Sequence, residues 1–124
     1  MNVLVDTSVW VDHLRSNEPE LNALLTAGIV FIHTLVIGEL ACGNLRDRAD
    51  RLNDWHALPS VPESRNGKVL TYIEDRKLMG RGIGLIDAHL LYATEQEGNT
   101  RLWTRDTRLH SVAEEFDLAY AESS

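Results

Sequence analysis

Residues 1–10, Met-Asn-Val-Leu-Val-Asp-Thr-Ser-Val-Trp, place an acid directly after an unbroken apolar run. The run at residues 3–5 is rich in β-branched residues, which is typical of a strand buried on both faces in a parallel sheet. An acid at the carboxyl end of such a strand points into the crevice where open α/β sheets bind ligands. Asp6 therefore has two interpretations. In the first, Asp6 is a site residue in that crevice. In the second, either Asp6 or Thr7 caps a helix that begins near Ser8.

Strand and helix patterns alternate along the rest of the chain. Continuous apolar runs predict further strands over residues 29–32, 58–61, 102–103 and 118–120. Apolar residues at helical spacing, punctuated by glycine and proline, predict helices over residues 8–15, 19–27, 34–45, 46–56, 64–79, 85–97 and 106–116. This alternation favours an α/β fold, a three-layer α/β/α domain with a mainly parallel central sheet of four to five strands. We expect one domain over residues 1–124, with a frayed tail at residues 121–124.

Individual residues refine this pattern. Thr34 is expected to cap the helix that begins there, and Pro59 to place the 58–61 strand at a sheet edge. Cys42 lies in an apolar helix and is expected in the core. The tryptophans are expected in the core or at an interface, and they are Trp10, Trp55 and Trp103.

The composition is that of a globular protein, with 44% hydrophobic and 25% charged residues in a chain of 124. A single cysteine excludes an internal disulfide and fits a reducing cytoplasm. No apolar run approaches the roughly 20 residues that a membrane span needs. The net charge of −7 argues against nucleic acid and anionic membranes as partners. That argument weakens if several acids gather on a metal ion and leave the remaining surface less negative.

Four acids occupy comparable places in the predicted fold, at strand ends or in the helices that follow: Asp6, Glu39, Asp87 and Asp106. In a parallel sheet these places share one edge, so we expect the four to converge. An ionised carboxylate is costly to bury in an apolar helix without a partner, which singles out Glu39. The simpler interpretations are a solvent-facing side for Glu39, a dipole-favoured helix start for Asp87 and an N-cap for Asp106.

Electrostatics decides what such a cluster needs. Two carboxylates about 4 Å apart repel by roughly 4 kcal/mol at an effective dielectric constant near 20. Four of them require a cation, and all-oxygen ligands select Mg²⁺ or Mn²⁺. Such a site suits phosphodiester hydrolysis, in which the metal activates water and stabilises the leaving oxygen.

The acids lie in four short motifs: Val-Leu-Val-Asp6-Thr-Ser-Val-Trp, Ile-Gly-Glu39-Leu, Gly-Ile-Gly-Leu-Ile-Asp87-Ala and Leu-Trp-Thr-Arg-Asp106. In this order and spacing they resemble the acidic motifs of the PIN-domain nucleases. The chain length and the residues within these motifs resemble those of the VapC toxins of bacterial toxin–antitoxin pairs. The resemblance extends from Asn2 to about Tyr120.

This resemblance implies an Mg²⁺- or Mn²⁺-dependent endoribonuclease that acts on transfer RNA or ribosomal RNA. It also implies a homodimer and an antitoxin whose tail covers the acidic pocket. Asp6 and Asp87 would be the principal metal ligands, with Glu39 and Asp106 completing the catalytic pocket. Small polar neighbours that could hold ligand carboxylates or substrate phosphate are Thr7 and Thr104.

The remaining candidates carry weaker signals. Arg105 and Arg108 lie near the expected pocket, where they either position phosphate or form a solvated helix face. Three arginines at positions 46, 48 and 51 are expected to face solvent or the antitoxin. The glycine-rich residues 80–84 lack the lysine of a phosphate loop and are interpreted as a hinge that places Asp87.

Two other functions fit the same fold. A phosphoacceptor receiver domain needs an acidic pair after the first strand and a lysine near the last, but Asp6 is followed by Thr7 and the only lysines are Lys68 and Lys77. A non-catalytic binding module would keep the fold without turnover, and the complete set of acids argues against it.

Overall fold

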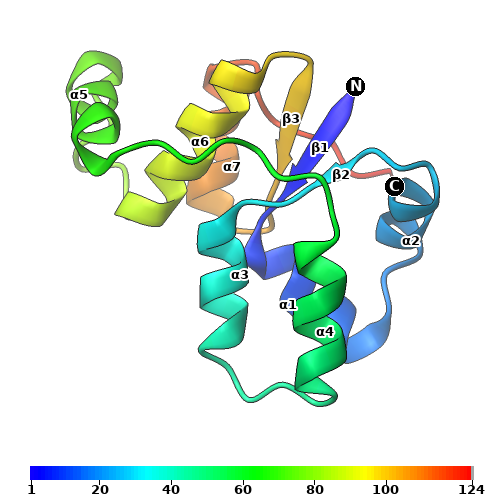
Figure 1. Ribbon diagram of the computed structural model, residues 1–124. Coiled ribbons are helices and arrows are strands. Elements are labelled where there is room, and N and C mark those ends of the chain that lie inside the picture. The colour runs from blue at the N-terminus through cyan, green and yellow to red at the C-terminus, as the bar shows by residue number, and fades with distance from the viewer. Residues whose placement is uncertain (124) are drawn as a thin grey trace.

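The computed structural model describes residues 1–123, and its sheet has three parallel strands in the order β2-β1-β3 (Figure 1). The central strand β1 (Asn2–Val5) pairs with β2 (Val30–Phe31) and with β3 (Thr100–Trp103). Residues 3–5 of β1 are at most 1% exposed, so this strand is covered on both faces as its apolar run predicts. Parallel pairing means that β1 and β3 end at the same edge of the sheet.

The sheet is smaller than the four to five strands predicted from the sequence. Residues 58–61 and 118–120 contribute only single bridges, from Ser60 to Ile32 and from Ala119 to Leu102. In the first segment, Pro59 and Pro62 flank the bridge and have no N–H to donate. The second segment exchanges two hydrogen bonds with Leu102, and the chain beyond it takes partners outside the sheet.

Seven helices surround the sheet within the described residues: α1 (Thr7–Ser16), α2 (Pro19–Thr26), α3 (Thr34–Ala41), α4 (Arg48–His56), α5 (Asn66–Arg76), α6 (Leu85–Glu97) and α7 (Thr107–Glu115). All seven were predicted from periodicity and breakers, and the bounds of α6 agree at both ends. The helix α3 ends four residues before the prediction. Its N-cap is His33 and not Thr34, because the His33 Nδ1 accepts a hydrogen bond from Leu35 N at 3.0 Å.

The helices form two groups around the sheet (Figure 1). The first group is α1, α3 and α4, which pack together beyond the end of the strands. In the second group, α6 packs against β3 and carries α5 on its outer side. The core is continuous between them, and Trp10, Trp55 and Trp103 are all buried in it as expected. Cys42 is exposed and not in the core, because it follows the last residue of α3.

The tail is bound to the fold over the part that the structure describes. Glu122 accepts a hydrogen bond from Trp103 Nε1 at 2.6 Å, and the Ser123 N–H donates to Glu20. These contacts differ from the fraying expected for residues 121–124, of which Ser124 lies outside the described residues. None of the helices within residues 1–123 has the length and apolar character needed to cross a membrane.

Candidate active site

Asp6 is buried where β1 ends and α1 begins, with only 6% of the residue exposed. Its Oδ2 accepts hydrogen bonds from Ser8 Oγ at 2.7 Å and from Thr104 Oγ1 at 2.8 Å. Asp6 holds the N-cap position of α1, but its side chain makes no capping hydrogen bond. Hydroxyl groups that follow two different strands therefore fix this carboxylate, and the capping interpretation is wrong for its side chain.

Glu39 reaches the same edge from α3. Its Oε1 accepts a hydrogen bond of 2.6 Å from Thr7 Oγ1, in the first turn of α1. The residue is exposed, so the argument from the cost of burying it in an apolar helix does not apply. The solvent-facing interpretation describes its exposure, and the contact with Thr7 nevertheless places it beside the segment that carries Asp6.

Asp87 lies in the first turn of α6 and is half-buried. Its Oδ2 accepts a hydrogen bond of 3.0 Å from the Gly84 N–H, at the N-cap of that helix. Two glycines earlier in the loop, Gly80 and Gly82, have positive φ angles of 72° and 80°, which side chains rarely adopt. The glycine-rich segment thus provides the turn that presents Asp87 at the start of α6.

Asp106 caps α7, as one of its two interpretations predicts. Its Oδ1 accepts hydrogen bonds from the backbone N–H groups of Arg108 at 3.0 Å and Leu109 at 3.1 Å. Its own N–H donates to Thr104 Oγ1 at 3.1 Å, the hydroxyl that also holds Asp6. Thr104 therefore links the backbone of Asp106 to the Asp6 carboxylate, and the cap role does not exclude Asp106 from the site.

One feature is common to the four acids. Each uses one carboxylate oxygen to accept hydrogen bonds from the protein, and within residues 1–123 its second oxygen has no such partner. Carboxylate oxygens are the donors that Mg²⁺ and Mn²⁺ prefer, so the residues fit these ions chemically. The side chains do not form a closed coordination shell, because no three histidine, cysteine or acidic residues in the described chain are placed to hold an ion.

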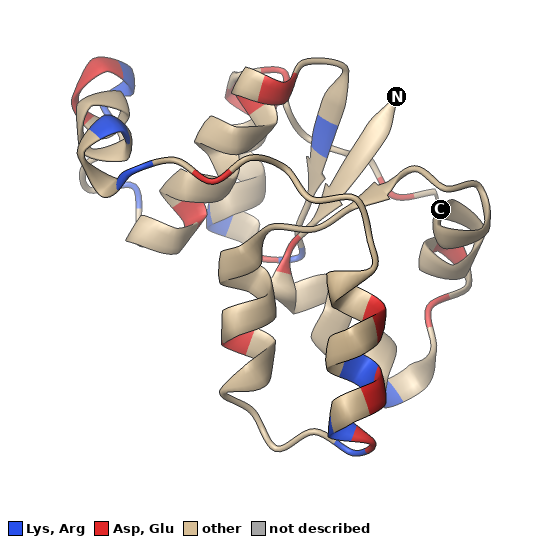
Figure 2. Ribbon diagram, viewed as in Figure 1, with Lys and Arg blue, Asp and Glu red and all other residues tan. Residues whose placement is uncertain are grey.

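The charges of the four acids interact. Burial raises the pKa of Asp87 above its ordinary value, the hydrogen bond from Gly84 opposes that rise, and the negative charges of Asp6, Asp106 and Glu39 add to it. The negative charges of the other three predicted residues therefore all act on Asp87. Figure 2 shows acidic segments where the strands end and α1 begins, and others on α3, α4, α5 and α6.

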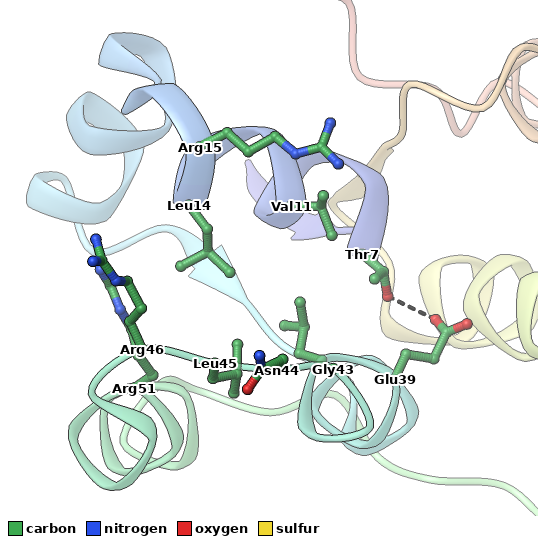
Figure 3. Close-up of a pocket in the computed structure, with 11 residues that line it drawn as sticks. Thr7, Val11, Leu14, Arg15, Glu39, Gly43, Asn44, Leu45, Arg46 and Arg51 are labelled. Carbon is green, nitrogen blue, oxygen red and sulfur yellow. Dashed lines mark hydrogen bonds between the residues drawn. The ribbon is translucent and has the colours of Figure 1, made fainter.

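A groove of about 500 Å³ leads away from the Thr7–Glu39 pair (Figure 3). Its walls come from α1, the end of α3, the loop that follows α3 and the first turns of α4. Four apolar side chains line it, and they are Val11, Leu14, Leu40 and Leu45. Arginines also line it, and they are Arg15, Arg46 and Arg51. The groove therefore combines an apolar surface with positive charge and ends at the acidic site.

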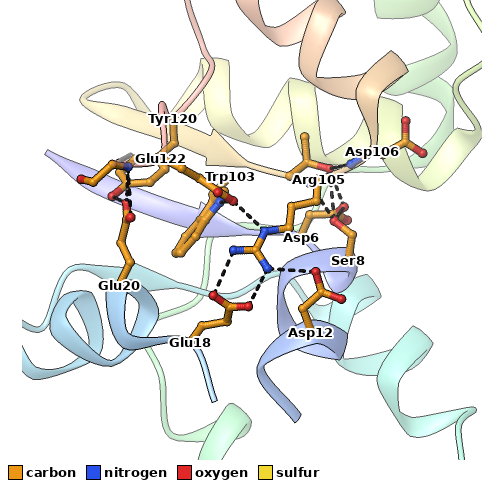
Figure 4. Close-up of polar contacts among 12 residues, drawn as sticks. Asp6, Ser8, Asp12, Glu18, Glu20, Trp103, Arg105, Asp106, Tyr120 and Glu122 are labelled. Carbon is orange, nitrogen blue, oxygen red and sulfur yellow. Dashed lines mark hydrogen bonds and ion pairs between the residues drawn. The ribbon is translucent and has the colours of Figure 1, made fainter. Parts of the chain in front are cut away.

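Arg105 was predicted either to position phosphate or to lie on a solvated face, but the structure gives it another role (Figure 4). Its guanidinium forms ion pairs with Asp12 and Glu18, both at 2.8 Å, and with Glu122 at 2.7 Å. Its backbone N–H donates to Ser8 Oγ at 3.0 Å, the hydroxyl that in turn holds Asp6. The three carboxylates thus neutralise the Arg105 guanidinium, and the Arg105 backbone helps to position the Asp6 carboxylate through Ser8.

The positioning role of Ser8 and Arg105 was not predicted from the sequence. Two of the three acids that bind Arg105 lie 87 and 93 residues away along the chain, and no periodicity reveals such contacts. The available signal was that hydroxyl residues follow two strands, at Thr7-Ser8 and at Thr104, beside the acids they hold.

Comparison with known proteins identifies the family of this chain. Residues 3–115 match the family model of the PIN domain. The chain is 42% identical over 120 residues to "Ribonuclease VapC32" from two strains of Mycobacterium tuberculosis, CDC 1551 / Oshkosh and ATCC 25618 / H37Rv, and the match covers 97% of each chain.

Solved structures share the fold at low sequence identity. PAE2754 from Pyrobaculum aerophilum superposes with a TM-score of 0.68 at 19% identity, covering 97% of this chain and 88% of that one. FitAcB from Neisseria gonorrhoeae superposes with a TM-score of 0.59 at 20% identity, covering 94% of both chains. The family match also removes the receiver-domain alternative. On the family model and on the 42% identity over nearly the whole chain, this protein belongs to the PIN-domain family and to its VapC group.

Proposed function

We propose that this protein is an endoribonuclease and the toxin of a toxin–antitoxin pair, and that it hydrolyses RNA phosphodiester bonds with Mg²⁺ or Mn²⁺ held by carboxylates. The observation that carries the proposal is the gathering of Asp6, Glu39, Asp87 and Asp106 at one sheet edge, each with an oxygen left without a protein partner within residues 1–123. The relative named as a ribonuclease supports RNA as the substrate. Transfer RNA and ribosomal RNA are the substrate classes we propose.

Asp6 and Asp87 would hold the ion, which supplies charge neutralisation and an activated water to phosphodiester hydrolysis. Ser8 and Thr104 hold the Asp6 carboxylate in place through its Oδ2. Glu39 is fixed by Thr7 and Asp106 by the first turn of α7, so both are preorganised to orient water or to complete the ligand set.

The decisive experiment compares wild type with Asp6→Asn on total transfer RNA and on ribosomal RNA, in Mg²⁺, in Mn²⁺ and in EDTA. We expect cleavage by the wild type to need the metal and to fall by about 100-fold or more in Asp6→Asn, equivalent to about 2.7 kcal/mol of transition-state stabilisation. Asp75→Asn is the matched control, because Asp75 is exposed on α5, away from the strand ends, and the same amide is introduced.

Equal cleavage by wild type and Asp6→Asn would show that the activity does not come from this site. A folded wild type that binds RNA without cutting it in either metal would instead favour the non-catalytic binding module. Circular dichroism of each variant separates loss of chemistry from loss of fold.

We further propose an antitoxin partner that occupies the groove beside the Thr7–Glu39 pair, and a homodimer as the active assembly. The apolar lining and three arginines of the groove suit an amphipathic segment with acidic residues. Co-purification with the product of the adjacent gene tests the partner, and light scattering of the purified chain tests the dimer. A monomer would contradict the proposed dimer without affecting the proposed chemistry.

A further inference from the structure

We propose that Arg108 binds a backbone phosphate of the RNA beside the bond that is cut. The inference rests on the proposed nuclease function and identifies a substrate-positioning residue for it. It depends on where the Arg108 side chain lies, on what the neighbouring arginines bind and on a glycine that makes room for the guanidinium.

Arg108 spans the two segments that present Asp106 and Asp87. Its backbone N–H donates to Asp106 Oδ1 in the first turn of α7. Its side chain lies against Gly82, where an added Cβ would be 2.5 Å from Arg108 Cδ and 3.0 Å from Nη1. Gly82 is two residues before Gly84, whose N–H holds Asp87. The Arg108 side chain therefore lies between the segment that carries Asp106 and the loop that leads to Asp87.

Neighbouring arginines are neutralised, whereas Arg108 is not. Arg105 is bound by three carboxylates, and Arg81, in the same glycine-rich loop as Gly82, pairs with Glu115 at 2.8 Å. Within residues 1–123, no carboxylate lies within 4.0 Å of the Arg108 guanidinium to form an ion pair. Arg108 is also exposed, so its donors are open to a ligand from solvent.

A phosphate is the ligand that this placement favours. RNA that approaches four carboxylates is repelled, and a nearby cation offsets that repulsion where the chain enters. Guanidinium groups bind phosphate oxygens through two parallel N–H donors and are always charged. The missing side chain at Gly82 leaves the space in which the guanidinium lies, which links the glycine to substrate binding as well as to the turn.

The test measures binding of fluorescein-labelled, mixed-sequence single-stranded RNA by anisotropy, in the Asp6→Asn background so that the probe stays intact. We expect Arg108→Ala to raise the Kd about tenfold and to lower the salt dependence of binding by about 0.7 in log–log slope, the value of one phosphate contact on a single strand. Arg108→Lys should recover part of the affinity, since lysine keeps the positive charge but lacks the two parallel N–H donors of the guanidinium. Arg101→Ala controls for the loss of one positive charge, because Arg101 pairs with Asp117 and lies on β3 away from the acidic edge.

Glycine variants test the same contact without altering the arginine. Gly82→Ala displaces the Arg108 side chain, whereas Gly80→Ala meets nothing within 4 Å and imposes a similar left-handed strain at φ 72°. We expect both to lower Tm by similar amounts, but only Gly82→Ala to raise the RNA Kd, by about threefold. In the Arg108→Ala background, Gly82→Ala should cause no further loss.

The outcomes separate this inference from the proposed function. Metal-dependent RNA cleavage by the wild type is assayed alongside the binding measurements. KM and kcat are also measured for Arg108→Ala with Asp6 intact. A rise in KM with kcat unchanged supports the inference.

Three results would overturn it. Cleavage that depends on Asp6, together with an unchanged RNA Kd in both Arg108→Ala and Gly82→Ala, overturns the inference but not the proposed nuclease function. Absence of Asp6-dependent cleavage by the wild type overturns both. Weaker antitoxin binding with unchanged RNA affinity would assign Arg108 to the protein partner and also overturn it.

Discussion

Two groups of carboxylates lie side by side at the same end of the sheet and have opposite electrostatics. In one, Arg105 binds three acids, and their hydrogen bonds to it lower the pKa values of Glu18 and Glu122. In the other, burial raises the pKa of Asp87 and the negative charges of Asp6, Asp106 and Glu39 add to that rise. The chain supplies its own cation to the first group. Under the proposed function, a cation from solution would neutralise the second.

The two groups are joined through Ser8. Its hydroxyl accepts from the Arg105 N–H at 3.0 Å and donates to Asp6 Oδ2 at 2.7 Å. The neutralised group, which also binds the C-terminal segment through Glu122, therefore forms part of the scaffold that holds the repulsive group in place (Figure 4). If this interpretation is right, disturbing the first group should cost stability, and removing charge from the second should increase it.

The largest stability effect is expected from Arg105→Ala, which removes the cation from three acids and the contact of its guanidinium with the Trp103 ring. We expect the free energy of unfolding in urea to fall by about 2 kcal/mol, the order expected for charged hydrogen bonds at a partly exposed site. Arg105→Lys should recover only part of this loss, because a lysine cannot bridge several carboxylates with a planar fork.

Arg101→Ala is the matched control for this comparison. Its single ion pair is to Asp117, whose side chain is 92% exposed, so we expect a change below about 0.5 kcal/mol. An equally small change for Arg105→Ala would mean that the Arg105 group is only a surface ion pair and does not support the site.

The second effect, of intermediate size, is metal binding. We expect Mn²⁺ at ten times its Kd to stabilise the metal-free wild type by about 1.4 kcal/mol, because an ion that binds only the folded state stabilises it by mass action. The rise in Tm should be lost in Asp6→Asn and retained in Asp12→Asn, which changes an acid of the Arg105 group. A Tm that rises equally in both variants would show that the ion binds elsewhere.

The sequence was sufficient where a signal is local. The apolar run that ends at Asp6 predicted the central strand, because burial on both faces needs continuous apolar residues. Breakers and spacing predicted each helix, and the shared edge of parallel strands predicted that the acids would approach one another. The roles of these acids in catalysis and metal binding remain predictions for the experiments above.

Long-range pairing was less predictable. Residues 58–61 and 118–120 look like strands locally, but extended pairing depends on partners and on available N–H groups, and each forms one bridge. The sequence also left open whether Glu39 is buried or exposed, since an almost wholly apolar helix does not reveal which narrow face meets solvent. The Arg105 group joins residues from both ends of the chain, which no pattern along the sequence indicates.

The smallest effect, and the sharpest comparison of the two groups, is their dependence on pH without metal. The pKa of Asp87 is raised in the fold from an ordinary value of 3.8, so its carboxyl destabilises the protein only once ionised. The destabilisation caused by the ionised Asp87 carboxylate is absent below pH 3.8 and grows as pH rises through the folded-state pKa. We therefore expect Asp87→Asn to raise Tm by only about 2 °C at pH 7 in EDTA, because solvent screens much of the repulsion at this partly exposed site. The gain in Tm should disappear toward about pH 3.5, where the wild-type carboxyl group is protonated.

Glu122→Gln should show the opposite dependence. The pKa of Glu122 is lowered by its hydrogen bond to Arg105, so its stabilisation is present above its ordinary value of 4.5 and is lost as pH falls through the folded-state pKa. The substitution should therefore destabilise the protein at pH 7 and have less effect in acid. Because Asp87→Asn and Glu122→Gln each replace one carboxyl group by an amide, opposite signs at pH 7 can come only from what surrounds the two carboxyl groups. Equal signs would mean that both groups sense only the net charge of the chain, and the distinction between a neutralised and a repulsive group would be lost.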